Sequence, residues 1–268
     1  MVLSKIKILS LLNLASVIIA LIFNYLAIAL PINNKTTGEL ADKYENYFVP
    51  AGFTFSIWGI IYLAILVFSA YTIYIAFKKD DADHNYVSRL SVWFIIANLA
   101  NGVWLIFWHY EWVIFSFITM LVILFNLLDM YYKMAESRPH SLPATLCLFV
   151  PISIYLGWIS VATIANITAA LVSVEWQGGF WHPSVWAVVM VGIATLLGII
   201  LIYVRGDQVF ALVITWALYG IYSKRMVLND AESLHVAKAA QYGLTLLLLY
   251  AALSLVGRKS YLFDKVGS

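Results

Sequence analysis

Long apolar runs separated by short polar segments divide the chain into eight predicted helices. Runs of about 20 apolar residues are typical of helices that cross a bilayer. The pattern predicts helices over about residues 6–30, 51–77, 90–110, 113–132, 150–171, 183–204, 208–222 and 236–256. The run at 208–222 is the shortest. We therefore predict an all-α integral membrane protein, a polytopic bundle of about eight transmembrane helices that forms a single domain over residues 1–268.

The loops between these runs predict the orientation of the chain. Residues 6–30 follow Lys5 and Lys7, as in a secretory signal, but the run is too long and has no obvious cleavage site, so we interpret it as a retained span. With the N-terminus inside, the cytoplasmic side receives eleven of the 16 Lys and Arg residues and the other side five. We predict a multi-pass protein of the plasma (inner) membrane of a prokaryote, with both termini cytoplasmic.

Composition supports an integral membrane protein and excludes some kinds of functional site. Of the 268 residues, 63% are hydrophobic and 11% charged, with a mean hydropathy of +0.89, whereas a soluble domain is nearer half apolar and a quarter charged. The net charge of +2 gives no nucleic-acid footprint. The single Cys147 excludes a disulfide framework and a Cys-based metal site. Aromatic content of 16%, with 10 Trp, is high and needs an explanation.

Aromatic and amide residues form stripes on three of the predicted helices. On 150–171, Tyr155, Trp158, Ala162 and Asn166 lie within roughly 80° of one another at 100° per residue. A polar amide in hydrocarbon is costly unless it finds a partner, so Asn166 should face other helices. The other two stripes consist of Phe55, Trp58, Tyr62 and Ser69, and of Trp93, Ala97, Asn101, Trp104 and Trp108.

The predicted topology brings these three stripes to a common depth. They all fall in the outer half of the membrane, beneath the polar connection at residues 31–50. This connection is the longest among the first five spans and can fold over the mouth of a helix bundle. We therefore expect a cavity in the outer leaflet, walled by indoles and amides and covered by a lid.

At these residues the chain resembles the tryptophan-rich sensory protein and translocator protein family (TspO/MBR, peripheral benzodiazepine receptors). The second helix of that family carries Trp and, four residues on, Tyr, as Trp58 and Tyr62 do here. Its third helix carries Leu-Asn-x-x-Trp; Asn101 and Trp104 keep that spacing, although Ala100 replaces the Leu. Its fifth-helix motif, Trp-x-Ser-x-Ala-Thr-x-x-Asn, is matched by Trp158, Ser160, Ala162, Thr163 and Asn166.

The resemblance covers about residues 8–173 and implies a five-helix core with a long first loop over a ligand cavity. Residues 183–256 hold three additional helices without a counterpart in the five-helix proteins, so the chain resembles an extended branch. The chain also departs from the family at Phe55, which precedes Trp58 by three residues instead of four. Family members bind porphyrins, and some bind sterols and benzodiazepine-type drugs.

The stripes and the resemblance together predict a ligand site formed by Phe55, Trp58, Tyr62, Asn101, Trp104, Trp108, Trp158, Ala162 and Asn166. A purely structural interpretation stays open for part of this pattern. Trp near helix ends is ordinarily an interfacial belt residue, which accounts for Trp112, Trp176 and Trp181 and extends to Trp108. The two Asn amides also fit ordinary hydrogen bonds between helices, worth about 0.6 kcal/mol on average.

The sequence favours a membrane receptor or sensor for a flat hydrophobic ligand, a tetrapyrrole (porphyrin or heme) or a sterol-like molecule. The alternative is a transporter of such a ligand, and an enzyme that modifies it is less favoured. His109, Glu111 and His182 have no spacing that demands a metal, and no catalytic residues are predicted. The expected partners are the lipid bilayer and the small ligand, without nucleic acid, and a homodimer is an open alternative.

Overall fold

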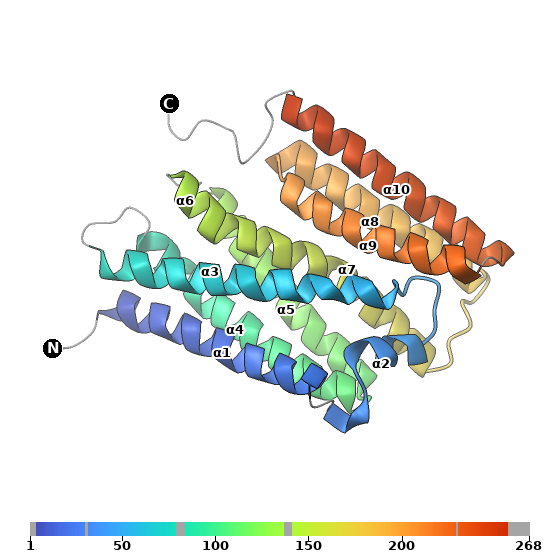
Figure 1. Ribbon diagram of the computed structural model, residues 1–268, viewed down its shortest axis with the longest axis horizontal. Coiled ribbons are helices and arrows are strands. Elements are labelled where there is room, and N and C mark those ends of the chain that lie inside the picture. Colours follow the sequence, from blue (N-terminus) through green and yellow to red (C-terminus); the bar gives the residue numbers. More distant parts are fainter. Residues whose placement is uncertain (1–3, 30–31, 79–83, 137–140, 229, 257–268) are drawn as a thin grey trace.

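The chain folds into a bundle of roughly parallel and antiparallel helices (Figure 1). The structure is a computed structural model that describes residues 4–29, 32–78, 84–136, 141–228 and 230–256. Within these ranges eight helices have at least 21 residues, as the apolar runs predict. They are α1 (Lys5–Ala29), α3 (Ile57–Phe77), α4 (His84–His109), α5 (Val113–Glu136), α7 (Val150–Ser173), α8 (Pro183–Arg205), α9 (Gln208–Leu228) and α10 (Ala231–Val256).

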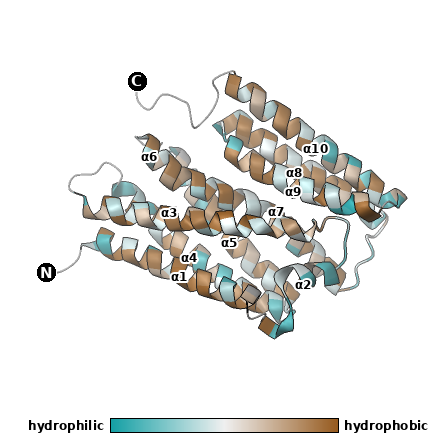
Figure 2. Ribbon diagram, viewed as in Figure 1, coloured by the Kyte–Doolittle hydropathy of each residue, from teal (hydrophilic) through white to brown (hydrophobic). Residues whose placement is uncertain are grey.

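Short helical segments join or extend the long helices. They are η1 (Ile32–Asn34), α2 (Thr37–Lys43), η2 (Gly52–Ser56), α6 (Leu142–Ala144) and the π-helical turn η3 (Thr145–Phe149). The predicted all-α membrane fold is confirmed. Figure 2 shows hydrophobic residues along the helices and hydrophilic residues concentrated near their ends and around α2.

Seven of the long helices in the described part of the chain are long and apolar enough to cross a membrane, and α9 is not among them. Its polar and charged residues lie near its two ends, at Gln208, Lys224 and Arg225. They lower its mean hydropathy, although the helix packs lengthwise against α7, α8 and α10. The helix that the sequence predicts at 208–222 is therefore present and extends to Leu228. Its neighbours in the bundle cover much of its surface.

Several predicted boundaries are wrong. Besides the longer α9, α10 begins at Ala231 instead of 236, and the helix predicted to start at Leu90 begins at His84 as α4. The reason is packing, because Tyr86, Val87 and Leu90 are buried on the inward face of this first part of α4. Residues 79–83 lie outside the described ranges.

Residues 32–50, called the lid below, cover one end of the bundle. They comprise η1, α2 and the extended chain that leads to η2, and Figure 1 shows α2 across the ends of the helices. A capping box starts α2, since the Thr36 side chain accepts from the Glu39 amide and Glu39 accepts from the Thr36 amide. The connection expected to fold over the bundle is thus an ordered element with its own helix.

Candidate functional site

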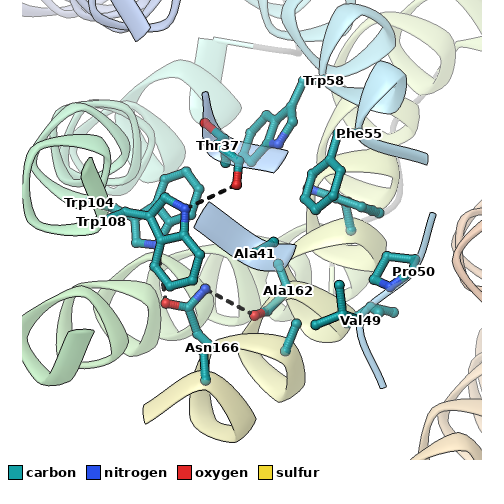
Figure 3. A pocket seen from close by; sticks show the side chains of 14 residues that line it. Thr37, Ala41, Val49, Pro50, Phe55, Trp58, Trp104, Trp108, Ala162 and Asn166 are labelled. Atoms are coloured by element: carbon teal, nitrogen blue, oxygen red, sulfur yellow. Dashed lines mark hydrogen bonds between the residues drawn. The ribbon is translucent and has the colours of Figure 1, made fainter. Parts of the chain in front are cut away.

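An apolar cavity, called the indole cavity below, lies directly under the lid (Figure 3). Seven of the nine predicted ligand residues line it: Phe55, Trp58, Trp104, Trp108, Trp158, Ala162 and Asn166. They come from η2, α3, α4 and α7, so the three stripes meet as the topology predicts. The lid closes the cavity with Thr37, Ala41, Val49 and Pro50. Whether these residues bind a ligand stays a prediction.

A ladder of four stacked aromatic rings runs through this region. The ring centroids of Tyr62 and Trp58 are 5.5 Å apart at 21°, those of Trp58 and Trp104 are 6.0 Å apart at 28°, and those of Trp104 and Trp108 are 6.3 Å apart at 15°. Trp158 meets Trp58 edge-on at 6.3 Å. Near-parallel, offset rings present flat apolar faces, which is the surface that a flat aromatic ligand would match.

The ladder separates two cavities. The indole cavity leaves only about 40 Å³ of free space between its side chains. A second space of about 470 Å³, called the side cavity, is bordered by α1, the lid, η2 and α4 and shares Thr37, Phe55, Trp58 and Trp104 with the first. Ligand cavities typically measure about 300–1,000 Å³. The side cavity falls in this range, whereas the indole cavity holds a ligand only if its indoles or the lid move.

Asn166 orients the ladder. Its Oδ1 accepts from Trp104 Nε1 at 3.3 Å and from Ser116 Oγ at 2.8 Å, and its Nδ2 donates to the Ala162 carbonyl at 3.4 Å. The amide is therefore satisfied by protein partners. Its position in the indole cavity agrees with the sequence prediction, and its hydrogen bonds agree equally with the interhelical interpretation.

The remaining two predicted residues, Tyr62 and Asn101, do not line the indole cavity. Both hydrogen-bond Asn24 of α1: the Tyr62 hydroxyl donates to Asn24 Oδ1, and Asn24 Nδ2 donates to Asn101 Oδ1 at 2.9 Å. Tyr62 borders the side cavity. Asn101 therefore acts as an interhelical amide between α1 and α4, the structural alternative that the sequence left open.

The indole N–H groups of Trp108 and Trp158 differ in their hydrogen bonding. Trp108 is 4% exposed and its Nε1 donates to the Thr37 carbonyl of the lid at 3.3 Å, so it is not a residue of the interfacial belt. Trp112 and Trp181, at 57% and 51% exposed, fit that belt. Trp158 Nε1 is buried without a hydrogen-bond partner in the described structure. Trp158 lines the indole cavity together with the polar residues Thr37 and Asn166, so one of the lining residues carries a donor that no described residue pairs.

A carboxylate between α4 and α5 holds the lid in place. Glu111 accepts from Lys35 Nζ at 2.7 Å, from Lys43 Nζ and from the Tyr44 hydroxyl at 3.0 Å. Its backbone is left-handed, with φ 60°, at a helix C-terminus where Gly is usual. Glu111 thus occupies a position that costs backbone strain. We call the cluster of Glu111, Lys35, Lys43 and Tyr44 the latch.

The latch is ionised at physiological pH. Hydrogen bonds from Lys35 and Lys43 lower the pKa of Glu111 to about 2, and burial, followed by the hydrogen bond to Glu111, raises the pKa of Tyr44 to about 12. A lowered carboxyl pKa means that the contribution of the latch is complete above about pH 4.5 and is lost only as the pH falls towards 2. Its strength should therefore not change between pH 5 and pH 8.

His109 joins the lid to the end of α4 by a second route. Its Nδ1 lies 3.1 Å from the Ile32 carbonyl and must donate to it, because a carbonyl only accepts. Nε2, 3.1 Å from Thr37 Oγ1, then accepts from that hydroxyl. Asn33 Nδ2 also donates to the His109 carbonyl at 3.0 Å. The neutral imidazole thus has a fixed tautomer and a structural role.

The opposite edge of the lid rests on α9. Lys224 pairs with Asp42 at 2.5 Å, and Arg225 Nη2 donates to the Asn46 carbonyl at 2.9 Å. Next to the lid, Gly220 approaches Thr54 of η2 so closely that an added Cβ would lie 2.0 Å from Thr54 Oγ1. The C-terminal helices therefore help to position the cover of the indole cavity.

Sequence reasoning did not identify the lid side chains, the latch or α9 as parts of the site. The apolar lining residues Ala41, Val49 and Pro50 have no pattern that distinguishes them from any loop. A signal for the latch did exist: two lysines in a predicted outer loop, and Glu111 in the next loop on the same side. Complementary charges in two loops at one end of a bundle are a reason to expect a contact.

The latch makes a testable prediction. Glu111→Gln removes two ion pairs, each worth about 0.2–1 kcal/mol at an exposed site. Lid opening, measured by hydrogen exchange of the α2 amides in lipid nanodiscs, should become roughly two- to thirtyfold faster. The matched control is Glu136→Gln, which removes an exposed pair with Arg89 outside the lid. Unchanged α2 exchange in Glu111→Gln would show that the lid is held without the latch.

Comparison with known proteins gives one match. The profile of a family described as TSPO-like protein matches residues 10–253, which include α8, α9 and most of α10 as well as the first five long helices. No curated protein and no solved structure matches significantly.

Proposed function

The chain belongs to the TSPO-like protein family, a premise from which we propose that it is a membrane sensor that binds a flat hydrophobic ligand of the tetrapyrrole class beside the aromatic ladder. The observation that carries this proposal is the ladder itself. Tyr62, Trp58, Trp104 and Trp108 stack with interplanar angles of 15–28°, and the two middle rings, Trp58 and Trp104, line both the side cavity and the indole cavity. A porphyrin or heme is the ligand that the family resemblance implies, and a sterol-like molecule is the other class.

The geometry of the two cavities supports a binding sequence. The ligand enters the side cavity, which Trp58 and Tyr62 line, and stacks against the ladder. Movement of Trp58 or Trp104 then opens the indole cavity, and the lid closes over the ligand. Binding of this kind favours ligands with a planar ring, because the face of an indole stacks best on another flat ring.

The experiment is a titration of the purified protein in nanodiscs with protoporphyrin, followed by its Soret absorbance and by tryptophan quenching. We expect saturable binding with a shifted Soret band. The matched control is the corresponding porphyrinogen, which carries the same substituents on a non-planar ring and should compete poorly under anaerobic conditions. Equal competition by the two would contradict a planar site, and no saturable binding would contradict the ligand class.

The same preparation distinguishes the alternatives. A transporter would concentrate protoporphyrin in proteoliposomes, whereas a sensor would only retain it saturably. An enzyme would generate a new absorbance that grows with time. The half of the bundle away from the lid is densely packed, with Phe68 and Phe94 fully buried and their ring centroids 4.3 Å apart. This packing favours a binding protein with a single entrance over a transporter.

We further propose that the lid faces the outside of a prokaryotic plasma membrane and that both termini are cytoplasmic. The Lys and Arg count supports this orientation, and Figure 1 shows that α1 begins at the end of the bundle where α10 ends. In a Cys147→Ala background, a cysteine at the fully exposed Phe180 should react with an impermeant thiol reagent added to intact cells. A cysteine at Ser88 should react only after lysis, and the reverse pattern would invert the topology.

A further inference from the structure

A cavity of about 570 Å³, called the interfacial cavity, lies on the other side of the lid from the ladder. Its walls are the end of α7, the start of α8, the end of α9, the start of α10 and lid residues 45–48. It shares no lining residue with the indole cavity, and its volume lies in the range of small-molecule sites, about 300–1,000 Å³. The charges and aromatic rings around it define what it would bind.

The floor of the interfacial cavity contains a guanidinium without an acidic partner. Arg225 is 2% exposed, donates through Nη2 to the Asn46 and Val49 carbonyls, and lies 5.5 Å from the Tyr47 ring centroid. No carboxylate of the described residues lies within 4 Å of it, and Nε has no hydrogen-bond partner. A buried charge in this state is costly, and the carboxylates of Glu45, Asp230 and Asp42 compensate it only from beyond 4 Å.

A second polar group lines the floor. The Ser233 side chain is fully buried, and its Oγ makes no hydrogen bond of good geometry within the described residues, although it lies close enough to the Asp230 carboxylate to join the Ser233 amide in lowering the pKa of that carboxyl. An arginine Nε–H and a serine hydroxyl are both donors. Together they call for an acceptor group, and the positive charge of Arg225 favours an anionic one.

The rim has the opposite charge. Glu45, Glu175 and Asp230 line the cavity at exposed positions, and none of them forms an ion pair with a Lys or Arg in the ranges that the structure covers. Of these, Asp230 also accepts from the Ser233 amide at 2.8 Å. The cavity therefore has a positive, buried floor and a negative, accessible rim.

One wall is aromatic and fixed. The ring centroids of Trp176 and Trp186 are 5.7 Å apart at 56°, and Trp186 Nε1 donates to the Gly178 carbonyl at 2.9 Å. Both indoles line the cavity next to Leu171 and Val172. Indole faces attract both apolar groups and substituted ammonium ions.

We propose that the interfacial cavity binds a zwitterion with an apolar portion. Its anionic group lies on the floor against Arg225 and Ser233, its ammonium group lies among the three rim carboxylates, and its apolar portion packs on Trp176 and Trp186. A simple anion would have to pass three carboxylates, and a simple cation would leave the floor donors unpaired. The two sources of this chemistry are a free aromatic amino acid and the headgroup of a zwitterionic phospholipid.

Three soluble probes of one shape test the charge requirement. Isothermal titration calorimetry is performed on the protein in nanodiscs of pure phosphatidylglycerol, which contain no zwitterionic lipid. L-phenylalanine should bind, whereas 3-phenylpropionate, which lacks the ammonium, and phenethylamine, which lacks the carboxylate, should bind at least tenfold more weakly. Equal binding of the three probes would overturn the proposal.

Variants assign the binding to this cavity. Ser233→Ala removes the hydroxyl but keeps the amide that donates to Asp230, so the fold should be spared while phenylalanine affinity falls about tenfold. Glu175→Gln should weaken the binding of phenylalanine but not that of 3-phenylpropionate. The controls Ser88→Ala and Glu136→Gln, remote from this cavity, should change neither. Wild-type affinity in Ser233→Ala would overturn the assignment.

The lipid source is tested in parallel with nanodiscs that contain phosphatidylethanolamine. If phenylalanine fails to bind, native mass spectrometry should find phosphatidylethanolamine retained on the wild type and lost from Ser233→Ala, which supports a headgroup site. If neither phenylalanine nor this lipid depends on Ser233, the proposal is wrong. None of these outcomes depends on porphyrin binding at the ladder, so the two sites succeed or fail separately.

Discussion

Replacing Trp104 or Trp158 with Leu should weaken porphyrin binding tenfold or more while leaving the bundle folded. Trp104 occupies the middle of the ladder, between the near-parallel rings of Trp58 and Trp108 at centroid distances of 6.0 and 6.3 Å, and it lines both the indole cavity and the side cavity. Stacking by one indole is worth about 0.5–1.5 kcal/mol beyond its buried area, and 1.4 kcal/mol is tenfold in affinity. Leu keeps an apolar side chain in the core but removes the ring face.

The effect of Trp158→Leu should have a second component. Trp158 is 3% exposed, and its unpartnered Nε1 is a donor for a polar substituent of the ligand. Binding is followed by the Soret band, since the substitutions change the tryptophan signal itself. Trp112→Leu, at an exposed belt position, is the control and should bind like the parent. If both cavity variants also bind like the parent, the indoles are structural and the ligand lies elsewhere.

The sequence predicted the features that depend on periodicity. Apolar runs set the eight long helices, and a 100° rotation per residue placed Trp58, Trp104, Trp158 and Asn166 on inward faces that meet under the lid. It is the spacing within each helix that fixes which residues share a face. The same spacing does not fix which neighbour a side chain selects.

That limit explains where the structure places Asn101 and Tyr62, whose part in ligand binding stays a prediction. Asn101 shares a face with Trp104, but its Oδ1 accepts from Asn24 of α1 because that amide faces it across the α1–α4 interface. The Tyr62 hydroxyl donates a hydrogen bond to the same Asn24. Asn24 belongs to a different helix, and the pairing depends on helix order in space, which hydrophobic periodicity leaves undetermined. The role of α9 was hidden for a related reason, since its contacts with the lid join residues about 180 positions apart.

These long-range contacts couple the C-terminal helices to the site. Trp216 Nε1 donates to the Thr54 carbonyl at 3.0 Å, and the Ala51 amide donates to the Gly220 carbonyl at 3.0 Å. With Lys224 and Arg225, they tie η2 and the lid to one face of α9. Anything that detaches α9 from the core should therefore loosen the cover of the indole cavity, even if the change occurs at the far end of the helix.

Asp207, just before α9, is the residue where this coupling can be tested. It is 1% exposed and accepts from Ser153 Oγ at 2.7 and 2.8 Å, from the Tyr131 hydroxyl at 2.9 Å and from the Phe210 amide at 3.0 Å. It thus joins α5 and α7 to the start of α9. Burial raises the pKa of its carboxyl, and hydrogen bonds from Phe210, Ser153 and Tyr131 offset part of that cost.

Asp207→Ala should destabilise the protein by about 2 kcal/mol or more, because it leaves buried donors on Ser153 and Phe210 unpaired at about 1–3 kcal/mol each. Thermal unfolding in detergent measures the loss, and protoporphyrin binding should weaken as the lid loosens. Asp207→Asn keeps an acceptor and should lose less on both measurements. Asp129→Asn removes a half-buried i,i+4 pair with Lys133, away from the lid, and should change little. If Asp207→Ala unfolds earlier yet binds like the parent below its transition, α9 stabilises the bundle without positioning the lid.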